Sequence, residues 1–219
     1  MSVVQDFLSL LDLEPIEHDI FRGQNRDLAT GRVFGGQVFA QALVAAQRTV
    51  PEGREAHSVH GYFLREGDLK APIVYFVDRP RDGRSFTSRR VTAIQHGEAI
   101  FHLSASFHIS EPGLDHQTAM PDVPDPESLP SELELIRARA DSLPEPFRAI
   151  VTQDRPIDIR NITPTDPFAR IERQDPATAA RRIWFRVKVP IADATWIHQA
   201  VLAYASDYGY LPTALLPHG

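Results

Sequence analysis

The chain has 219 residues, of which 42% are hydrophobic and 24% are charged, so it can bury one large core or two small ones. Its formal charge of −6 argues against a nucleic-acid partner, because neutralising phosphates requires a basic surface. The lack of cysteine excludes disulfides, a thiolate nucleophile and cysteine-ligated metal sites. Any catalysis must therefore use oxygen or imidazole groups, and we expect neither a metal nor a cofactor.

The sequence shows no signal for membrane insertion or export. No apolar run approaches the roughly 20 residues that a membrane span needs. The first residues, Met1 to Asp6, also lack the basic start of a secretory signal. We therefore expect a cytoplasmic protein without a membrane span.

Two helices are predicted within the first fifty residues. Apolar residues recur at helical spacing over residues 3–11, and Pro15 ends that short helix. A second helix over residues 36–48 opens at Gly35 and Gly36. Its apolar positions, many of them alanine, cover more than one stripe, which predicts a slim and buried helix.

From residue 57 to residue 109 the pattern changes to period two, which is typical of strands with one buried face. Turns at Gly83 and Gly97 are suited to joining antiparallel neighbours. The predicted strands cover residues 57–66, 72–80, 84–95 and 98–109. One slim buried helix followed by a long antiparallel sheet indicates an α+β protein of the hotdog fold, in which the sheet wraps the helix.

The second half begins with a proline-rich stretch. Residues 110–156 contain eight prolines and are predicted to form a linker, with a short helix capped by Ser131 and Glu134 inside it. Strands are predicted at 157–162 and 182–189, and a helix that is apolar nearly all round at 194–206. Because that helix is similar in character to the first slim helix, the expected domains are a first hotdog over 1–110, a linker over 111–156 and the N-terminal part of a second hotdog over 157–219.

The two expected hotdogs differ in size. The first runs from Gly35 to Ile109, whereas the second, from Ala194 to Gly219, is short by about fifty residues if repeats are alike. We therefore expect the sequence to be a fragment of a longer two-hotdog chain. On its own, the second apolar helix needs cover from the first sheet or from another subunit, and we expect a homo-oligomer.

Several short motifs follow one another along the chain, and together they are far more specific than any one alone. The motifs are Phe21-Arg22-Gly23-Gln24, Val33-Phe34-Gly35-Gly36-Gln37, His57-Ser58-Val59-His60-Gly61-Tyr62-Phe63-Leu64-Arg65, Arg81-Asp82-Gly83-Arg84-Ser85-Phe86, Ala105-Ser106-Phe107, Tyr204-Ala205-Ser206-Asp207 and Leu216-Pro217-His218-Gly219. In this order they resemble the acyl-CoA thioesterase II family. The resemblance implies a double hotdog that binds acyl-CoA and hydrolyses it to a free fatty acid and CoA.

The resemblance also implies where the catalytic site lies. In this family an Asp, a Thr and a Gln of the second hotdog hold the water that attacks the thioester carbonyl. The Asp falls at Asp207 in this sequence. The Thr and the Gln are expected beyond Gly219.

Asp207 suits this role on chemical grounds. A thioester is already activated, so an oriented water with a carboxylate as general base can suffice. An acid next to an apolar helix is expected to be partly buried, and at the helix C-terminus it opposes the helix dipole. The alternative is that Asp207 is a solvated residue at a helix end.

Three further residues are candidates for binding substrate. The free N–H groups at Gly35 and Gly36 could bind a thioester oxygen or a developing oxyanion. The reading that we favour is that these glycines let a strand and the helix approach closely. His60 is a minor candidate for substrate contact, although a structural role is favoured. His57 and His60 are three residues apart on one strand, so we expect them to face opposite sides and to share no metal.

Two other functions stay open from the sequence. A hotdog hydratase or dehydratase needs a neighbouring Asp and His, but the Asp-x-Asn-Pro-x-His pattern of the hydratases does not occur here. A non-catalytic acyl-CoA binding or assembly module belongs to a different class. Release of free thiol from an acyl-CoA supports the hydrolase, whereas binding without turnover supports the module.

Overall fold

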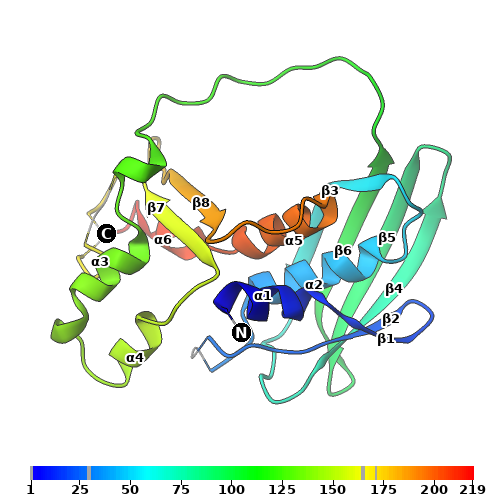
Figure 1. Cartoon of the computed structure of the whole chain (residues 1–219), viewed down its shortest axis with the longest axis horizontal. Helices are drawn as coiled ribbons and strands as arrows, with labels where there is room; N and C mark the ends of the chain where they lie inside the picture. The colour runs from blue at the N-terminus through cyan, green and yellow to red at the C-terminus, as the bar shows by residue number, and fades with distance from the viewer. Residues whose placement is uncertain (1, 29–30, 164–165, 171) are drawn as a thin grey trace. The chain divides into compact units, whose positions relative to one another are not determined.

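The computed structural model describes residues 2–28, 31–163, 166–170 and 172–219. The chain forms two compact units (Figure 1). The first comprises Met1–Leu114 and Ile191–Asp207, and the second comprises Asp115–Pro190 and Tyr208–Gly219. The chain thus leaves the first unit, returns to it for a segment that ends at Asp207, and leaves it again.

The described part of the first unit is built around an antiparallel sheet. Its strands are β1 (Glu14–Glu17), β2 (Ile20–Gly23), β3 (Arg54–Phe63), β4 (Ile73–Asp82), β5 (Phe86–Gln95) and β6 (Glu98–Ile109). Their order is β1-β2-β4-β5-β6-β3, and all neighbours are antiparallel. The strands predicted between residues 57 and 109 are present. The sequence did not predict the β1–β2 hairpin, in which Pro15 lies on the edge strand, a position that tolerates a missing N–H.

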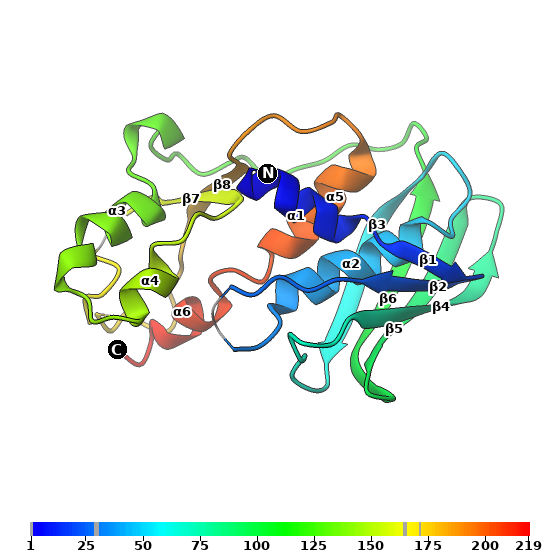
Figure 2. The ribbon, with the colours of Figure 1, turned by 60° about the horizontal axis from the view of Figure 1, so that its bottom comes forward.

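Helix α2 (Gly35–Gln47) lies against this sheet and is buried along most of its length. Its alanines at positions 40, 42, 45 and 46 are completely buried, and their small side chains let neighbouring elements come close. Figures 1 and 2 show α2 running along the sheet with α5 beside it. The predicted α+β hotdog fold, with a slim helix packed on an antiparallel sheet, is confirmed.

A buried polar cluster ties α2 to the elements around it. The Nε2 of the fully buried Gln41 donates to the carbonyl oxygens of Leu10 and Gln24, at 2.7 and 2.9 Å. The hydroxyl of Tyr75 on β4 donates to Oε1 of Gln41 at 2.7 Å. All the polar atoms of this amide are therefore used, and the network links the N-terminal segment and the sheet through one side chain.

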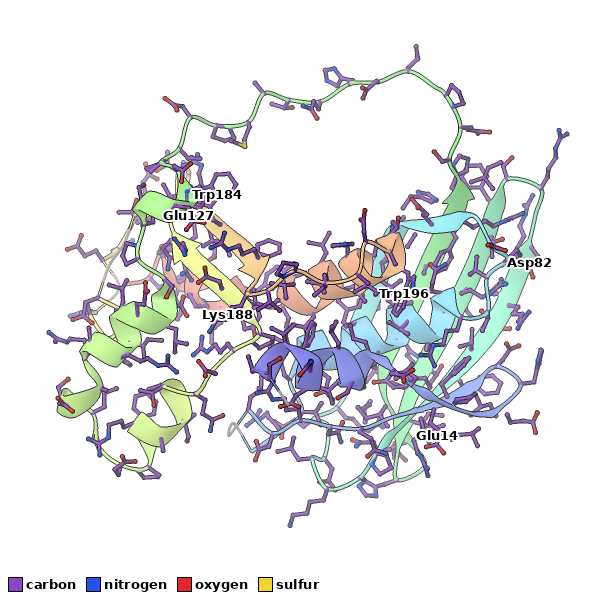
Figure 3. The ribbon with its side chains drawn as sticks, viewed as in Figure 1. Glu14, Asp82, Glu127, Trp184, Lys188 and Trp196 are labelled. Carbon is purple, nitrogen blue, oxygen red and sulfur yellow. The ribbon has the colours of Figure 1, made fainter. Side chains whose placement is uncertain are left out.

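A second buried polar group lies at the other end of α2. The guanidinium of Arg89, only 1% exposed, donates to the side-chain and backbone oxygens of Thr49 at 2.7 and 2.8 Å. It also donates to Oδ1 of Asp82 at 2.7 Å. Asp82 lies at the end of β4 (Figure 3) and its side chain is 45% exposed, so only one partner of this ion pair is buried.

Helices α1 (Val3–Leu11) and α5 (Thr195–Ala205) complete the first unit. Helix α1 starts with a capping box between Ser2 and Gln5, and its Phe7 ring contacts the Tyr204 ring at 4.6 Å between centroids. The apolar helix predicted at 194–206 is present as α5 and packs against α2. The second hotdog expected from residue 157 onward stays a prediction.

The second unit contains short elements. These are the 3₁₀ turns η1 (Pro126–Ser128) and η2 (Ala140–Ser142), helices α3 (Glu132–Ala138), α4 (Phe147–Val151) and α6 (Tyr210–Leu215), and strands β7 (Ile157–Asn161) and β8 (Ile183–Val187). The predicted capping box of Ser131 and Glu134 opens α3, and the two predicted strands pair antiparallel. Trp184 on β8 donates its indole N–H to the carbonyl oxygen of Pro124 at 3.0 Å (Figure 3).

Candidate active site

The C-terminal end of α5 meets the N-terminal end of α2, and Asp207 lies at this junction. Asp207 follows the residue that caps α5, and its Oδ2 accepts a hydrogen bond from the backbone N–H of Gly36 at 2.9 Å. No partner of Oδ1 lies in the part of the chain that the structure describes. One carboxylate oxygen is thus held by the helix, and the other is available to a bound water.

The two glycines predicted as site residues make this contact possible. A Cβ at Gly36 would lie 2.3 Å from the carbonyl oxygen of Tyr204, and a Cβ at Gly35 would lie 2.7 Å from Oδ2 of Asp207. Real Cβ atoms essentially never come so near, so any other residue forces the helices or the carboxylate to move. The close approach expected from the sequence is present, with α5 as the neighbouring element instead of a strand.

The environment of Asp207 acts on its charge in two ways. Partial burial raises the pKa of the Asp207 carboxyl above its ordinary value, and the hydrogen bond from Gly36 lowers this pKa by a smaller amount. The sequence placed Asp207 at the unfavourable negative end of α5. The structure adds the positive end of α2, whose N–H groups favour a carboxylate.

The backbone N–H of Gly35 is a second hydrogen-bond donor at the N-terminal end of α2. This N–H belongs to the first turn of α2 and has no hydrogen-bond partner among the described residues. The Gly36 N–H, by contrast, is occupied by Asp207. Of the two glycines that the sequence proposed for binding a substrate oxygen, only Gly35 keeps its N–H available.

An apolar cavity of about 340 Å³ adjoins Gly35. Its lining is mostly aliphatic and aromatic and consists of Val33, Gly35, Val38, Phe63, Leu64, Arg65, Glu66, Gly67 and Ile100. The ring of Phe63 is 3.0 Å from the place where a Gly35 Cβ would be. This cavity could not be predicted from the sequence, because its walls come from the start of α2, from the end of β3 with the loop after it, and from the start of β6, which are far apart in the chain.

His60 is not brought to this group of residues. It lies on β3 opposite Ser104 of β6, on the face of the sheet that points away from α2, and it is exposed. Its ring contacts that of Tyr62 at 4.8 Å between centroids. Its neighbour Gly61 faces the core, because a Cβ there would meet the Phe101 ring at 2.5 Å.

The expectation that His57 and His60 face opposite sides is wrong. A register shift between Ala56 and Ser58 interrupts the alternation of β3 at His57. His57 consequently lies on the outer face, where its Nε2 is 2.8 Å from Oγ of Ser106. Even so, the described residues contain no group of three or more acidic, His or Cys side chains that could hold a metal ion.

Two aromatic residues, Tyr204 and Phe34, lie next to the candidate site. Tyr204 precedes Asp207 by three residues, and its ring contacts the Phe34 ring at 5.0 Å between centroids. Phe34 is the N-cap residue of α2. Both rings belong to motifs that carry the family resemblance, although the motifs alone did not predict a role for either ring.

Comparisons with known proteins agree with this architecture. Residues 25–108 match the family model described as the acyl-CoA thioesterase N-terminal domain. "Acyl-CoA thioesterase 2" of Haemophilus influenzae is 40% identical over 217 residues, which cover 99% of this chain and 74% of that protein. Human "Acyl-coenzyme A thioesterase 8" is 41% identical, with 96% of this chain and 67% of that protein covered.

A solved structure shows the same relationship. The crystal structure of an acyl-CoA thioesterase II, TesB2, from Mycobacterium marinum superposes with a TM-score of 0.74 at 39% identity. The match covers 97% of this chain and 71% of the solved one. The chain belongs to the acyl-CoA thioesterase II family. Among the described residues, no helix has both the length and the apolar character to cross a membrane.

Proposed function

We propose that the protein hydrolyses acyl-CoA thioesters and that Asp207 activates the attacking water. The observation that carries this proposal is the hydrogen bond between Asp207 and Gly36, which holds a half-buried carboxylate beside an apolar cavity. Family membership supports the substrate class, since relatives at about 40% identity are named acyl-CoA thioesterases. The cytoplasmic location and the homo-oligomer stay predictions.

The proposed reaction needs no covalent bond between the acyl group and the enzyme. The Asp207 carboxylate accepts a proton as the water oxygen attacks the thioester carbonyl carbon. The tetrahedral intermediate then collapses, its C–S bond breaks, and the CoA sulfur takes up the proton from Asp207. The products are the free acid and CoA.

The N–H of Gly35 is proposed to donate to the carbonyl oxygen as negative charge develops on it. This donor lies at the start of α2, where the helix dipole favours an anion. His60 has no part in this proposal, because it lies on the outer face of the sheet.

The test is the Asp207→Asn variant of the purified protein. The amide keeps the size of the side chain but cannot act as a base, so we expect kcat to fall by about 10²–10⁴-fold. Release of free thiol from an acyl-CoA measures the rate, and circular dichroism verifies the fold. The matched control is Asp78→Asn, which changes an exposed residue of β4 and should keep the parental rate. A kcat of Asp207→Asn within a few-fold of the parent contradicts the assignment.

The same assay examines the alternative of a non-catalytic acyl-CoA binding module. In that case the parent protein binds an acyl-CoA, detected by calorimetry, and releases no thiol. Thiol release above the spontaneous rate excludes this alternative.

A further inference from the structure

Polar contacts tie helix α5 to the rest of the first unit at two places. At its C-terminal end, Asp207 accepts the hydrogen bond from the Gly36 N–H. Near its start, the side-chain amide of Gln199 binds the backbone of Ala56 on β3. The Nε2 of Gln199 donates to the Ala56 carbonyl oxygen at 2.9 Å, and its Oε1 accepts from the Ala56 N–H at 3.3 Å. The proposed base thus lies on a segment that is anchored at both ends.

The position of Ala56 explains why an amide suits this anchor. Strand β3 lies at one edge of the described sheet, with β6 as its neighbour on the other side. Both backbone groups of Ala56 are bound by Gln199, so its amide takes the place of a residue on a neighbouring strand. A side-chain amide can donate and accept at once, whereas a carboxylate only accepts and an apolar side chain does neither. The two bonds therefore fix Gln199 at one residue of β3.

The packing between α5 and α2 gives this anchor a purpose. Small side chains make up much of the buried face of α5, which includes Ala200, Ala203 and Ala205. Contacts between small apolar groups have little directionality, so they resist sliding less than hydrogen bonds do. A shift of one residue along the helix would move Asp207 by about 1.5 Å. A misplacement of about 1 Å at a reacting group can lower a rate by about 10²-fold.

We propose that Gln199 is a positioning residue for the hydrolysis: its bonds to Ala56 set the place of α5 along the sheet and thereby hold Asp207 against Gly36. The inference rests on the proposed role of Asp207 as the base and adds the residue that positions it. Gln199 lies about two helical turns before Asp207 and acts on it only through the helix. The residues that line the cavity beside Gly35 come from other elements than α5. A change at Gln199 should therefore affect kcat more than KM.

The first test measures thiol release from an acyl-CoA by two variants of Gln199. Gln199→Met keeps the length and helix propensity of the side chain but makes neither bond, so we expect kcat to fall by about 10–100-fold and KM to stay within about threefold. Gln199→Asn keeps the amide on a side chain that is one methylene shorter, so α5 must shift to keep the bonds, and kcat should fall with a smaller loss of stability. The matched control is Tyr75→Phe, which removes a buried hydrogen bond to Gln41 in the same unit and should keep the parental kcat despite its lower stability.

The second test needs no turnover. The Gly36 N–H lies in the first turn of α2, where the helix supplies no acceptor, and its acceptor is Asp207. Hydrogen exchange of this amide, followed by NMR, therefore reports how firmly the carboxylate is held. Exchange at Gly36 should be about tenfold faster, or more, in Gln199→Met than in the parent. Tyr75→Phe should leave it within about twofold of the parental rate.

The outcomes separate this inference from the proposed function. In an Asp207→Asn background the base is already lost, so adding Gln199→Met should lower kcat by no more than about twofold. If Gln199→Met loses the same factor in both backgrounds, it does not act through Asp207 and the inference is overturned. Parental kcat and parental Gly36 exchange in folded Gln199→Met overturn it as well. If the parent releases no thiol, the hydrolysis itself is wrong, and the exchange at Gly36 still decides whether Gln199 holds the carboxylate.

Discussion

Gly36 lies so close to Tyr204 that a Cβ at Gly36 would be 2.3 Å from the Tyr204 carbonyl oxygen. This contact brings the first turn of α2 against the last turn of α5. Because the obstacle is backbone, neither partner can rotate away, and a larger residue must push the helices apart. The neighbouring Gly35 faces a movable carboxylate instead, so the two glycines should respond differently to substitution.

Gly36→Ala is expected to destabilise the fold. Overpacking of this kind typically lowers the free energy of unfolding by about 1–3 kcal/mol. We expect a loss near the upper end of this range, because backbone atoms must move to make room for the Cβ. Urea unfolding followed by circular dichroism measures the change. Gly113→Ala is the matched control, because a Cβ at Gly113 meets nothing within 4 Å. This variant should have the same free energy of unfolding as the parent.

Gly35→Ala is expected to reduce activity more than stability. Its Cβ would lie 2.7 Å from Oδ2 of Asp207, and the carboxylate can rotate away at little cost to the fold. The rotation breaks the hydrogen bond to Gly36 and misplaces the proposed base. We expect kcat to fall at least tenfold while the urea midpoint stays near that of the parent. Full activity in this variant would argue that the carboxylate geometry does not matter.

The pH dependence of the reaction should report Asp207. Burial raises the pKa of this carboxyl, so it is protonated at pH values where an exposed aspartate is already charged. Only the charged form can take a proton from water. We expect kcat/KM to fall on the acid side with an apparent pKa above the usual aspartate range. An acid limb at the pKa of an exposed aspartate would contradict this environment.

Tyr75→Phe tests the polar cluster around Gln41. Removal of the hydroxyl leaves the buried Oε1 of Gln41 without its donor, at an expected cost of about 1–3 kcal/mol in the free energy of unfolding. Chemical denaturation measures the change in the free energy of unfolding. The control Tyr62→Phe removes a hydroxyl from a side chain that is 64% exposed and should change the unfolding free energy by less than about 0.5 kcal/mol.

Arg89→Met should destabilise the protein in a pH-dependent way. The change leaves Thr49 and Asp82 without their buried hydrogen-bond donor. We expect the free energy of unfolding to fall by about 2–3 kcal/mol, and not by more, because Asp82 is half-exposed and water can solvate its carboxylate.

The hydrogen bond from Arg89 lowers the pKa of Asp82 in the folded state. The ion pair therefore contributes fully above the unfolded-state pKa of this carboxyl, and the contribution is lost as the pH falls toward the lowered folded-state pKa. The stability difference between parent and variant should shrink in acid. A difference independent of pH would assign the loss to packing alone.

The hotdog fold could be predicted because its pattern is local. The alternation over 98–109 and the alanine-rich helix after Gly36 each show in a few consecutive residues. The β1–β2 hairpin was missed because Pro15 also suits the end of a helix. The outward turn of His57 was missed because a β-bulge leaves no clear mark in the sequence.

The site could be predicted only in part. Asp207, Gly35 and Gly36 came from motifs, but nothing in the spacing showed that Asp207 would bind the N-terminus of α2. The apolar cavity depends on three elements that meet only in the folded chain. Such contacts depend on tertiary packing, which residue patterns do not specify.

The bond between Gly36 and Asp207 joins residues that are 171 positions apart, and this separation has a consequence during translation. At about 5–20 residues per second, the start of α2 leaves the ribosome about 10–30 s before Asp207 does. For that interval the nascent chain carries α2 without its capping carboxylate and without α5 to cover it. The proposed base and its helix therefore come together late, and chaperones that recognise exposed apolar helices have time to bind the growing chain before the site exists.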